Sequence, residues 1–227
     1  MKTVVDQAII LRRINYGEAD RILTLLTKEH GKVSCIAKGV RRPKSKLAGG
    51  LELLSVSSIS YIEGRSELKT IVSTQLDTHF GNIVNDLPRT MLAYDFLKLI
   101  DARTEHECEE TYFTVLESAL EGLNSSDTNA HVTHAWFLAC ILQLSGTHMN
   151  IEKQVGGADY EEDATYAYDF DNMGFFAHPS GTFTPKHIKL LRLFSKVNAP
   201  SHLLHVAGAG ELSEELVSLL RYGLQQV

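Results

Sequence analysis

Five short runs rich in β-branched residues succeed one another within the first eighty residues, and this succession limits the possible folds more than any other feature. They cover residues 4–13, 21–28, 32–38, 53–63 and 67–77. Turn signals, for example Gly17 and Gly31, separate them. The connections leave no room for crossover helices, so neighbouring strands are expected to pair antiparallel. Five such strands predict a small closed barrel, such as an OB-fold, over residues 1–80.

Side chains alternate in character along the run 32–38. Apolar or small side chains share one face, at Val33, Cys35 and Ala37, and polar ones share the other, at Lys32, Ser34 and Lys38. Because successive residues of a strand point to opposite sides of a sheet, the first set is expected in the barrel core. Cys35 is therefore interpreted as a small core residue.

Apolar residues recur at helical spacing from about residue 87 onward. The pattern predicts helices over 88–103, 107–123, 184–197 and 213–224, and a further one that Asp127 caps and Gly146 ends. The predicted fold class is therefore α+β, with a five-stranded OB-fold barrel followed by an all-helical domain over 81–227.

Residues 150–184 interrupt the helical pattern with glycines, a short acidic run and many aromatic residues. We expect a small hairpin-like insert here, with its turn near residues 171–174. The insert contains no cysteine, and His178 is its one histidine. Because tetrahedral zinc requires several thiolate or imidazole ligands, we predict no zinc in this segment.

The composition is that of an ordinary globular protein, since 44% of the residues are hydrophobic and 22% are charged. No apolar run is long enough to span a bilayer, and residues 1–6 lack the apolar core of a signal peptide. The three cysteines, Cys35, Cys108 and Cys140, lie far apart and form no CxxC motif. This pattern favours a reducing compartment, so a cytoplasmic location without membrane attachment is expected.

Charge is segregated along the chain. Residues 1–80 carry a net charge of +5, whereas residues 81–227 carry −11, which together give the overall −6. Lys38, Arg41, Arg42, Lys44 and Lys46 fall within nine positions of one Gly- and Pro-containing loop. A cluster of like charges repels itself, so it favours a partner of opposite sign; a solvated surface loop is the alternative. The basic front half is a candidate for binding a polyanion.

Common signatures of enzymes are missing from the sequence. It contains no GxxxxGK[ST], GxGxxG, GxSxG or HExxH motif. Ser66 and Lys69 fit the short SxxK pattern, but the motifs that accompany it in acyl-transfer enzymes are absent. His131 and His134 have a spacing that metal ligands can use, yet no thiolate or carboxylate pair lies near them in sequence. We therefore expect neither catalysis nor a cofactor.

Several segments of the first fifty-five residues, in their order and spacing, resemble the bacterial recombination mediator family RecO. These are residues 8–13 (AIILRR), 16–27 (YGEADRILTLLT), 30–32 (HGK), 37–42 (AKGVRR) and 44–52 (KSKLAGGLE). The resemblance implies an OB-fold, a helical domain and a role in DNA repair. It also implies DNA binding, annealing of complementary strands, and loading of recombinase onto strands coated by single-stranded-DNA-binding protein, with RecR as a partner. Many members hold zinc through four cysteines where this chain has residues 150–184, which makes the segment a cysteine-free relic of a zinc-ribbon-like insert.

The predicted DNA-binding surface combines one face of the barrel with the basic loop and should contact single- and double-stranded DNA through phosphates. Its residues are Arg12, Arg13, Arg21, Lys32, Lys38, Arg41, Arg42, Lys44 and Lys46. Some of the arginines could pair with Glu18, Asp20 or Glu52 instead. A pure protein adaptor, in which the loop meets an acidic partner, and a hydrolase with an unrecognised site are the competing functions.

The resemblance also implies a site in the helical domain for the acidic, aromatic-tipped tail of single-stranded-DNA-binding protein. Because this domain is acidic, docking requires a local cation beside an apolar groove. Arg89, Lys98 and Arg103 on the helix 88–103 are the predicted contacts, at most two of which should touch one tail. The alternatives are that they are ordinary surface charges, or that the tail meets Lys186, Lys189 and Arg192.

Overall fold

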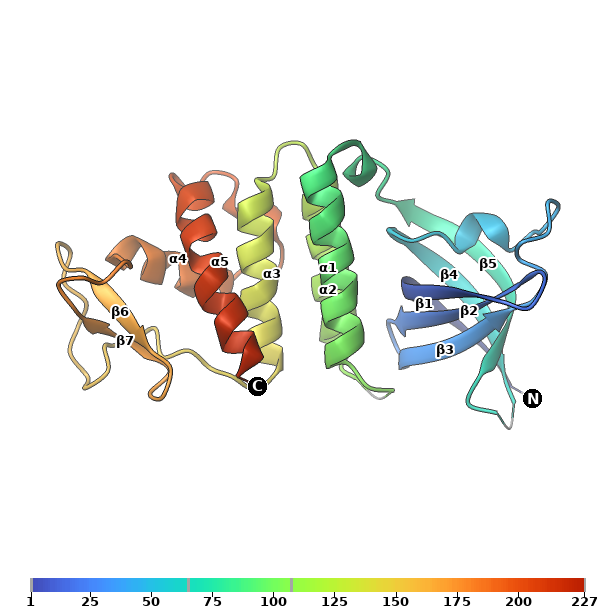
Figure 1. The fold of residues 1–227 in the computed structure, drawn as a ribbon, viewed down its shortest axis with the longest axis horizontal. Coiled ribbons are helices and arrows are strands. Elements are labelled where there is room, and N and C mark those ends of the chain that lie inside the picture. The colour runs from blue at the N-terminus through green and yellow to red at the C-terminus, as the bar shows by residue number, and fades with distance from the viewer. Residues whose placement is uncertain (1, 65, 107, 227) are drawn as a thin grey trace. The chain divides into compact units, whose positions relative to one another are not determined.

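The computed structural model describes residues 2–64, 66–106 and 108–226. The chain divides into two compact units, the first ending at Asn124 and the second starting at Ser125 (Figure 1). Three short 3-10 turns accompany the main elements, at Ala48–Gly50, Ile83–Asn85 and Pro200–Leu203. No described helix has the length and apolarity needed to cross a bilayer.

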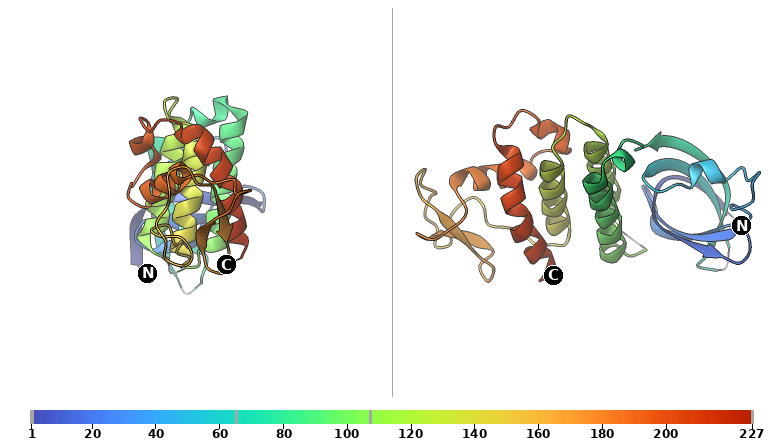
Figure 2. Two further views of the ribbon diagram at one scale, coloured as in Figure 1. Left: turned by 90° about the vertical axis from the view of Figure 1, so that its left-hand side faces the viewer. Right: turned by 45° about the horizontal axis from the view of Figure 1, so that its top comes forward.

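The first unit is built on a closed five-stranded barrel, which is seen clearly in the right-hand view of Figure 2. Its strands are β1 (Lys2–Tyr16), β2 (Asp20–Thr27), β3 (Gly31–Ala37), β4 (Ser55–Glu63) and β5 (Lys69–His79). They close in the order β1-β2-β3-β5-β4. The five predicted strands, the OB-fold barrel and the α+β class are confirmed. One pairing differs from expectation: β3 and β5 run parallel, through two residue pairs only.

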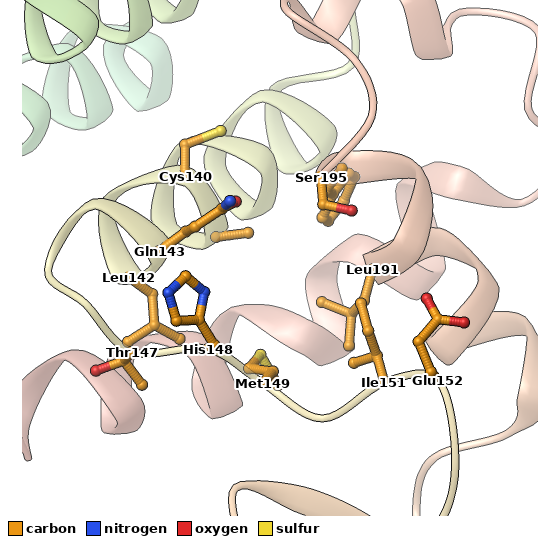
Figure 3. Close-up of a pocket in the computed structure, with 12 residues that line it drawn as sticks. Cys140, Leu142, Gln143, Thr147, His148, Met149, Ile151, Glu152, Leu191 and Ser195 are labelled. Atoms are coloured by element: carbon orange, nitrogen blue, oxygen red, sulfur yellow. The ribbon is translucent and has the colours of Figure 1, made fainter.

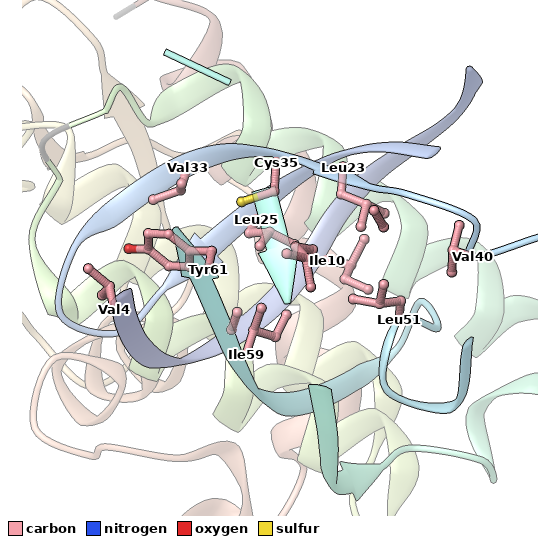
Figure 4. Close-up of a cluster of buried hydrophobic side chains, with 13 residues drawn as sticks. Val4, Ile10, Leu23, Leu25, Val33, Cys35, Val40, Leu51, Ile59 and Tyr61 are labelled. Atoms are coloured by element: carbon pink, nitrogen blue, oxygen red, sulfur yellow. The ribbon is translucent and has the colours of Figure 1, made fainter. Parts of the chain in front are cut away.

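The barrel core confirms the alternation that the sequence shows in β3. Val33, Cys35 and Ala37 are buried, and they pack with side chains from the other strands, including Ile10 and Tyr61 (Figure 4). Burial raises the pKa of the Cys35 thiol to about 12, so it stays protonated and behaves as a small apolar group. Cys35 is thus a core residue, as predicted.

Two helices complete the first unit. They are α1 (Leu87–Arg103), which packs on β1, and α2 (Glu110–Asn124), which packs on β2. Ile9 and Leu26 are register partners on the outer side of these strands, and both are fully buried because the helices cover them. The helix predicted over 107–123 begins at Glu110, and Glu107 lies outside the described residues. A domain boundary at residue 80 stays a prediction.

The second unit contains α3 (Ala130–Leu144), α4 (Pro185–Phe194) and α5 (Ala209–Gln225), with α3 packed against both other helices. The predicted cap of α3 was wrong. Asn129, not Asp127, accepts hydrogen bonds from the backbone N–H groups of the first turn. A capping side chain must directly precede the helix to reach these groups, and Asp127 lies two residues too early.

The predicted hairpin is present as β6 (Tyr166–Asp169) paired with β7 (Gly174–Ala177). Its turn is held by the Asp169 carboxylate, which accepts hydrogen bonds from the N–H groups of Asp171 and Asn172. Edge-to-face ring contacts join the strands and their surroundings, between Tyr168 and Phe170, Tyr168 and Phe175, and Phe175 and Phe183. Aromatic packing therefore organises this segment.

Candidate nucleic-acid interface

The loop between β3 and β4 is fixed at both ends and exposed in the middle. Val40 and Leu51 are buried in the barrel core. Between them, the Thr74 hydroxyl of β5 donates to the Leu47 carbonyl at 3.2 Å. Gly50 is required here, since a Cβ at this position would lie 2.6 Å from the Thr74 Oγ1. Because these contacts hold both ends of the loop in place, the residues between them extend into solvent from fixed positions.

The basic loop, which we define as residues 38–46, presents its cations to solvent. Its exposed basic residues are Lys38, Arg41, Arg42, Lys44 and Lys46. Successive turns order it, because the Arg42 N–H donates to the Gly39 carbonyl at 3.1 Å and the Ser45 N–H to the Arg42 carbonyl at 3.0 Å. None of the five cations forms an ion pair with another described residue. Their charge is therefore available to an external anion.

The basic loop is tied to the β1–β2 turn. The Gly39 N–H donates to the Asp20 carboxylate at 2.7 Å, and the Arg41 N–H donates to the Ala19 carbonyl at 2.9 Å. Gly39 has φ +65°, a backbone conformation that glycine adopts without steric cost. Two of the segments that carry the family resemblance, residues 16–27 and 37–42, thus meet in space.

Arg13 and Arg21 lie near the same end of the barrel but have internal partners. The Arg13 guanidinium pairs with Glu52 at 2.6 Å, and the Arg21 Nε donates to the Asn15 Oδ1 at 3.2 Å. Register places Arg21 opposite Ala37, directly before the basic loop. Three carboxylates were predicted as possible partners of these arginines. Among the described residues, Glu52 is the one of the three that forms an ion pair with an arginine.

Arg12 and Lys32 occupy a different place from the basic loop. The Lys32 Nζ donates to the Asp101 carbonyl at 2.7 Å and lies 3.4 Å from its carboxylate, and the Arg12 Nε lies 3.7 Å from the same carboxylate. The Lys32 side chain is only 18% exposed. Although Lys32 and Lys38 share a strand face, six residues of extended chain separate them by about 20 Å. The structure thus splits the nine predicted contacts into two groups.

The three cations predicted on α1 do not form one cluster. Arg89 and Lys98 are nine positions apart, which is half a turn around a helix. The Arg89 guanidinium donates to the Leu123 carbonyl at 2.8 Å, and so links α1 to the end of α2. Arg103 lies in the last turn and is half-buried, whereas Lys98 is exposed.

An apolar stripe runs along the exposed side of α1. Leu87 is 70% exposed, Met91 61% and Tyr94 39%, and their spacing of four and three residues places them on one face with Lys98. Met91 is apolar but does not lie on the buried face of the helix. The buried residues of α1 are Ala93, Phe96, Leu97 and Ile100.

A cavity of about 250 Å³ lies between α3 and α4 (Figure 3). Apolar side chains such as Leu142 and Leu191 line it, together with His148 and Glu152. No lysine or arginine is among the described residues that line it. Burial raises the pKa of Cys140, which also lines it, to about 12, so the cavity offers no thiolate. The part of the chain that the structure describes contains no group of three metal-ligating side chains.

Comparison with known proteins finds similar sequences for the barrel and for part of the helical region. Residues 1–80 match the family model described as "Recombination protein O N terminal". Proteins named DNA repair protein RecO are similar to the chain: that of Desulfatibacillum aliphaticivorans is 33% identical over 158 residues, 68% of this chain and 61% of the relative. That of Heliobacterium modesticaldum is 43% identical over 144 residues, 63% of this chain and 50% of the relative.

A RecO protein of Pelodictyon phaeoclathratiforme is 29% identical over 191 residues, 81% of this chain and 71% of the relative. The chain spans about half to three fifths of the length of the first two relatives. The matched barrel carries the basic loop and its link to the β1–β2 turn. On these grounds, residues 1–80 belong to the family of RecO N-terminal domains, and the chain as a whole is similar to RecO proteins.

Proposed function

We propose that this protein acts in DNA repair and recombination as a non-enzymatic mediator. In this proposal it binds single- and double-stranded DNA, anneals complementary single strands without ATP, and helps to load a recombinase onto coated strands. Its relatives are named DNA repair proteins. The observation that carries the proposal is the basic loop, whose exposed cations have no carboxylate partner among the described residues. The loop is anchored by the buried side chain of Val40 and by the hydrogen bond of Gly39 to Asp20.

The physical basis is phosphate binding. When a cation binds a DNA phosphate, it releases a counterion from the DNA, which favours binding. A cation without an internal ion pair does this without first breaking such a pair, so its full contribution adds to DNA affinity. Aromatic platforms are scarce on the barrel surface, where Tyr16 is exposed and Tyr61 is buried. Stacking on bases therefore contributes little, and binding should depend weakly on sequence and strongly on salt. The basic loop provides the principal contacts, and Arg21 lies beside it.

The test is a fluorescence-anisotropy titration of a short single strand at several salt concentrations. Changing Arg41, Arg42, Lys44 and Lys46 to Ala should weaken binding to any sequence and reduce the slope of log affinity against log salt by about 3. The matched control changes Lys153, Lys186, Lys189 and Lys196 to Ala, which removes the same charge from the second unit. Unchanged affinity in the folded loop variant would refute the proposal.

Annealing should need no fuel, because base pairing supplies the free energy while the cations reduce repulsion between two phosphate backbones. The protein should accelerate duplex formation from complementary oligonucleotides in the absence of ATP. The competing function is a protein adaptor whose basic loop meets an acidic partner. It predicts that the loop variant anneals and binds DNA as the wild type does.

We also propose RecR and the acidic tail of single-stranded-DNA-binding protein as partners, and a cytoplasmic, nucleoid-associated location. The stripe of Leu87, Met91 and Tyr94 beside Lys98 supplies an apolar surface next to one cation, which suits an acidic peptide with an aromatic tip. Arg89 and Arg103 are secondary contacts. Met91→Asp with Lys98→Glu should abolish binding of a tail peptide, whereas Lys186→Glu with Lys189→Glu should not. If the Lys186→Glu, Lys189→Glu variant loses binding and the Met91→Asp, Lys98→Glu variant does not, the tail binds to α4 instead.

A further inference from the structure

The insert contains two short turns, one on each side of the β6–β7 hairpin in the chain (Figure 1). In the first turn the Gly157 N–H donates to the Gln154 carbonyl at 2.9 Å, and in the second the Gly181 N–H donates to the His178 carbonyl at 2.9 Å. Each turn therefore spans four residues, and twenty residues separate the two turns. Two turns of this length and separation have the spacing of paired zinc ligands, C-x2-C followed by a second C-x2-C.

The resemblance to RecO implies zinc in this segment, but the side chains at the two turns do not fit it. Tetrahedral zinc requires several thiolate or imidazole ligands, and the insert contains no cysteine. Its one imidazole, that of His178, accepts the Ser180 N–H at 3.2 Å through Nδ1. The Asp159 carboxylate pairs with Lys153 at 3.1 Å, and the Asp169 carboxylate holds the turn of the hairpin. A group other than a metal ion therefore connects the two turns.

The side chain of Gln154 makes this connection. Gln154 is only 9% exposed, and both ends of its carboxamide are hydrogen-bonded. Its Oε1 accepts the Ala177 N–H at 3.1 Å, and its Nε2 donates to the Asp159 carbonyl at 2.7 Å. Ala177 directly precedes the second turn, and Asp159 lies just after the first. One buried amide, with its donor and its acceptor satisfied, thus joins the two turns.

The carboxamide extends a line of backbone hydrogen bonds along one edge of β7. The Val155 N–H donates to the Phe175 carbonyl at 2.8 Å. Alternate residues of a strand direct their N–H and carbonyl groups to the same edge, so the Ala177 N–H lies on the edge that Val155 contacts. The Oε1 of Gln154 therefore takes the place that a backbone carbonyl of a neighbouring strand would occupy.

A second side chain fixes the segment that carries Gln154. The Arg192 guanidinium of α4 donates to the Ile151 carbonyl at 2.8 Å and to the Glu152 carbonyl at 2.7 Å. It also lies 5.5 Å from the centroid of the Tyr160 ring, a cation–π contact. Because these bonds hold the chain just before the first turn, Gln154 has a defined position from which to reach the second.

We propose that the carboxamide of Gln154 is the cross-link of the insert, and that it makes the fold of the insert independent of zinc and of thiol chemistry. A zinc–thiolate site loses its metal when a chelator competes, when acid protonates the thiolates or when an oxidant attacks them. A carboxamide undergoes none of these changes, so the two turns stay joined. This inference does not rest on the proposed DNA-binding function, since it uses neither the basic loop nor α1.

The test is amide hydrogen exchange of the full chain, followed by NMR at the Ala177 N–H, with the Leu220 N–H of α5 as the reference for global unfolding. Gln154→Met keeps the length of the side chain and removes both hydrogen bonds. Protection of the Ala177 N–H should fall about ten-fold or more, while that of Leu220 should change less than about two-fold. Gln225→Met, at an exposed position, is the matched control and should leave both unchanged.

Two further measurements complete the test. Gln154→Asn is one methylene shorter and cannot reach both partners, so it should lose protection at Ala177 as well, and it replaces Gln154→Met if that variant does not fold. The wild type treated with EDTA, or with the thiol oxidant diamide, should keep its protection at Ala177 within about two-fold. The proposal is overturned if the folded Gln154 variants keep wild-type protection at Ala177, if Gln225→Met loses as much, or if EDTA or diamide removes the protection of the wild type.

Discussion

The carboxylate of Asp20 accepts a hydrogen bond from the backbone N–H of Gly39, at 2.7 Å. Asp20 is the first residue of β2, and Gly39 follows the end of β3. The bond therefore joins the β1–β2 turn to the basic loop, which the Arg41 N–H to Ala19 bond reinforces. Two of the segments that carry the family resemblance, residues 16–27 and 37–42, are thereby joined, and the two bonds hold the start of the basic loop against the β1–β2 turn.

Asp20→Ala should cost about 1–2 kcal/mol of unfolding free energy, because it leaves the Gly39 N–H without its charged acceptor. DNA affinity should fall as well, since the basic loop loses an anchor. Asp20→Asn retains an acceptor oxygen and should cost less. Urea unfolding and anisotropy titration check both effects. Glu18→Ala is the control, because Glu18 is exposed and should change stability by less than about 0.5 kcal/mol.

Lys32 and Lys38 should respond differently to the same substitution. Lys32→Met leaves the Asp101 carbonyl and carboxylate without a donor, so it should cost about 1–2 kcal/mol of stability while DNA affinity changes less than two-fold. Lys38→Met should leave stability unchanged and weaken DNA binding, since Lys38 is exposed and unpaired among the described residues. Equal loss of DNA affinity in both variants would show that Lys32 also contacts DNA.

Gly31 and Gly17 both have positive φ, at +66° and +55°, but differ in their surroundings. A Cβ at Gly31 would meet the His106 carbonyl oxygen, whereas one at Gly17 meets nothing. Gly31→Ala should therefore cost about 3 kcal/mol or more, through backbone strain and a steric clash. Gly17→Ala should cost about 1 kcal/mol, through strain alone. Chemical denaturation compares them, and similar losses would contradict this account.

His134 should make stability depend on pH. Burial lowers its pKa to about 4, with Arg221 and then His131 contributing. Below the ordinary pKa of about 6.5 the unfolded chain binds a proton that the folded chain does not, so stability is complete above that pH and falls as the pH decreases toward 4. Between about pH 7.5 and pH 5 this loss should reach about 2 kcal/mol.

The measurement is urea unfolding of the wild type and of His134→Gln at both ends of that pH range. Between the two pH values, the unfolding free energy of the variant should fall by about 2 kcal/mol less than that of the wild type, since the variant lacks the titrating imidazole. His205→Gln serves as the control because His205 is exposed, and it should retain the wild-type slope. The same slope in all three proteins would show that His134 is not responsible.

The insert should be stable without metal. A chelator should leave the melting temperature of the protein unchanged, because aromatic contacts and the Asp169 turn hold the hairpin. Phe175→Ala should cost about 3–5 kcal/mol, since Phe175 is fully buried between Tyr168 and Phe183. Phe176→Ala, at a half-buried ring, should cost less. Calorimetry checks each value, and a lower melting temperature with chelator would reveal a bound metal.

Local patterns were sufficient for most of the secondary structure. Alternation over residues 32–38 predicts β3 and its buried Cys35, and the residues around Gly174 predict the turn of the hairpin. Such inferences succeed because the period of a strand or helix depends on its own backbone geometry. The ends of the helices were predicted less accurately, as the cap of α3 shows, which is Asn129 and not Asp127. A cap depends on the position of one side chain relative to the four free N–H groups of the first turn.

The amino-acid sequence by itself determined the barrel, the helices, the basic loop and the resemblance to RecO. Only the tertiary structure decided which cations are available. Lys32 and Asp101 are sixty-nine residues apart and form a contact that no spacing rule reveals. Met91 is exposed on α1 although its helix is largely apolar. The reason is physical: periodicity shows which side of an element is apolar, but pairing of charges and burial of a face depend on which other elements pack there.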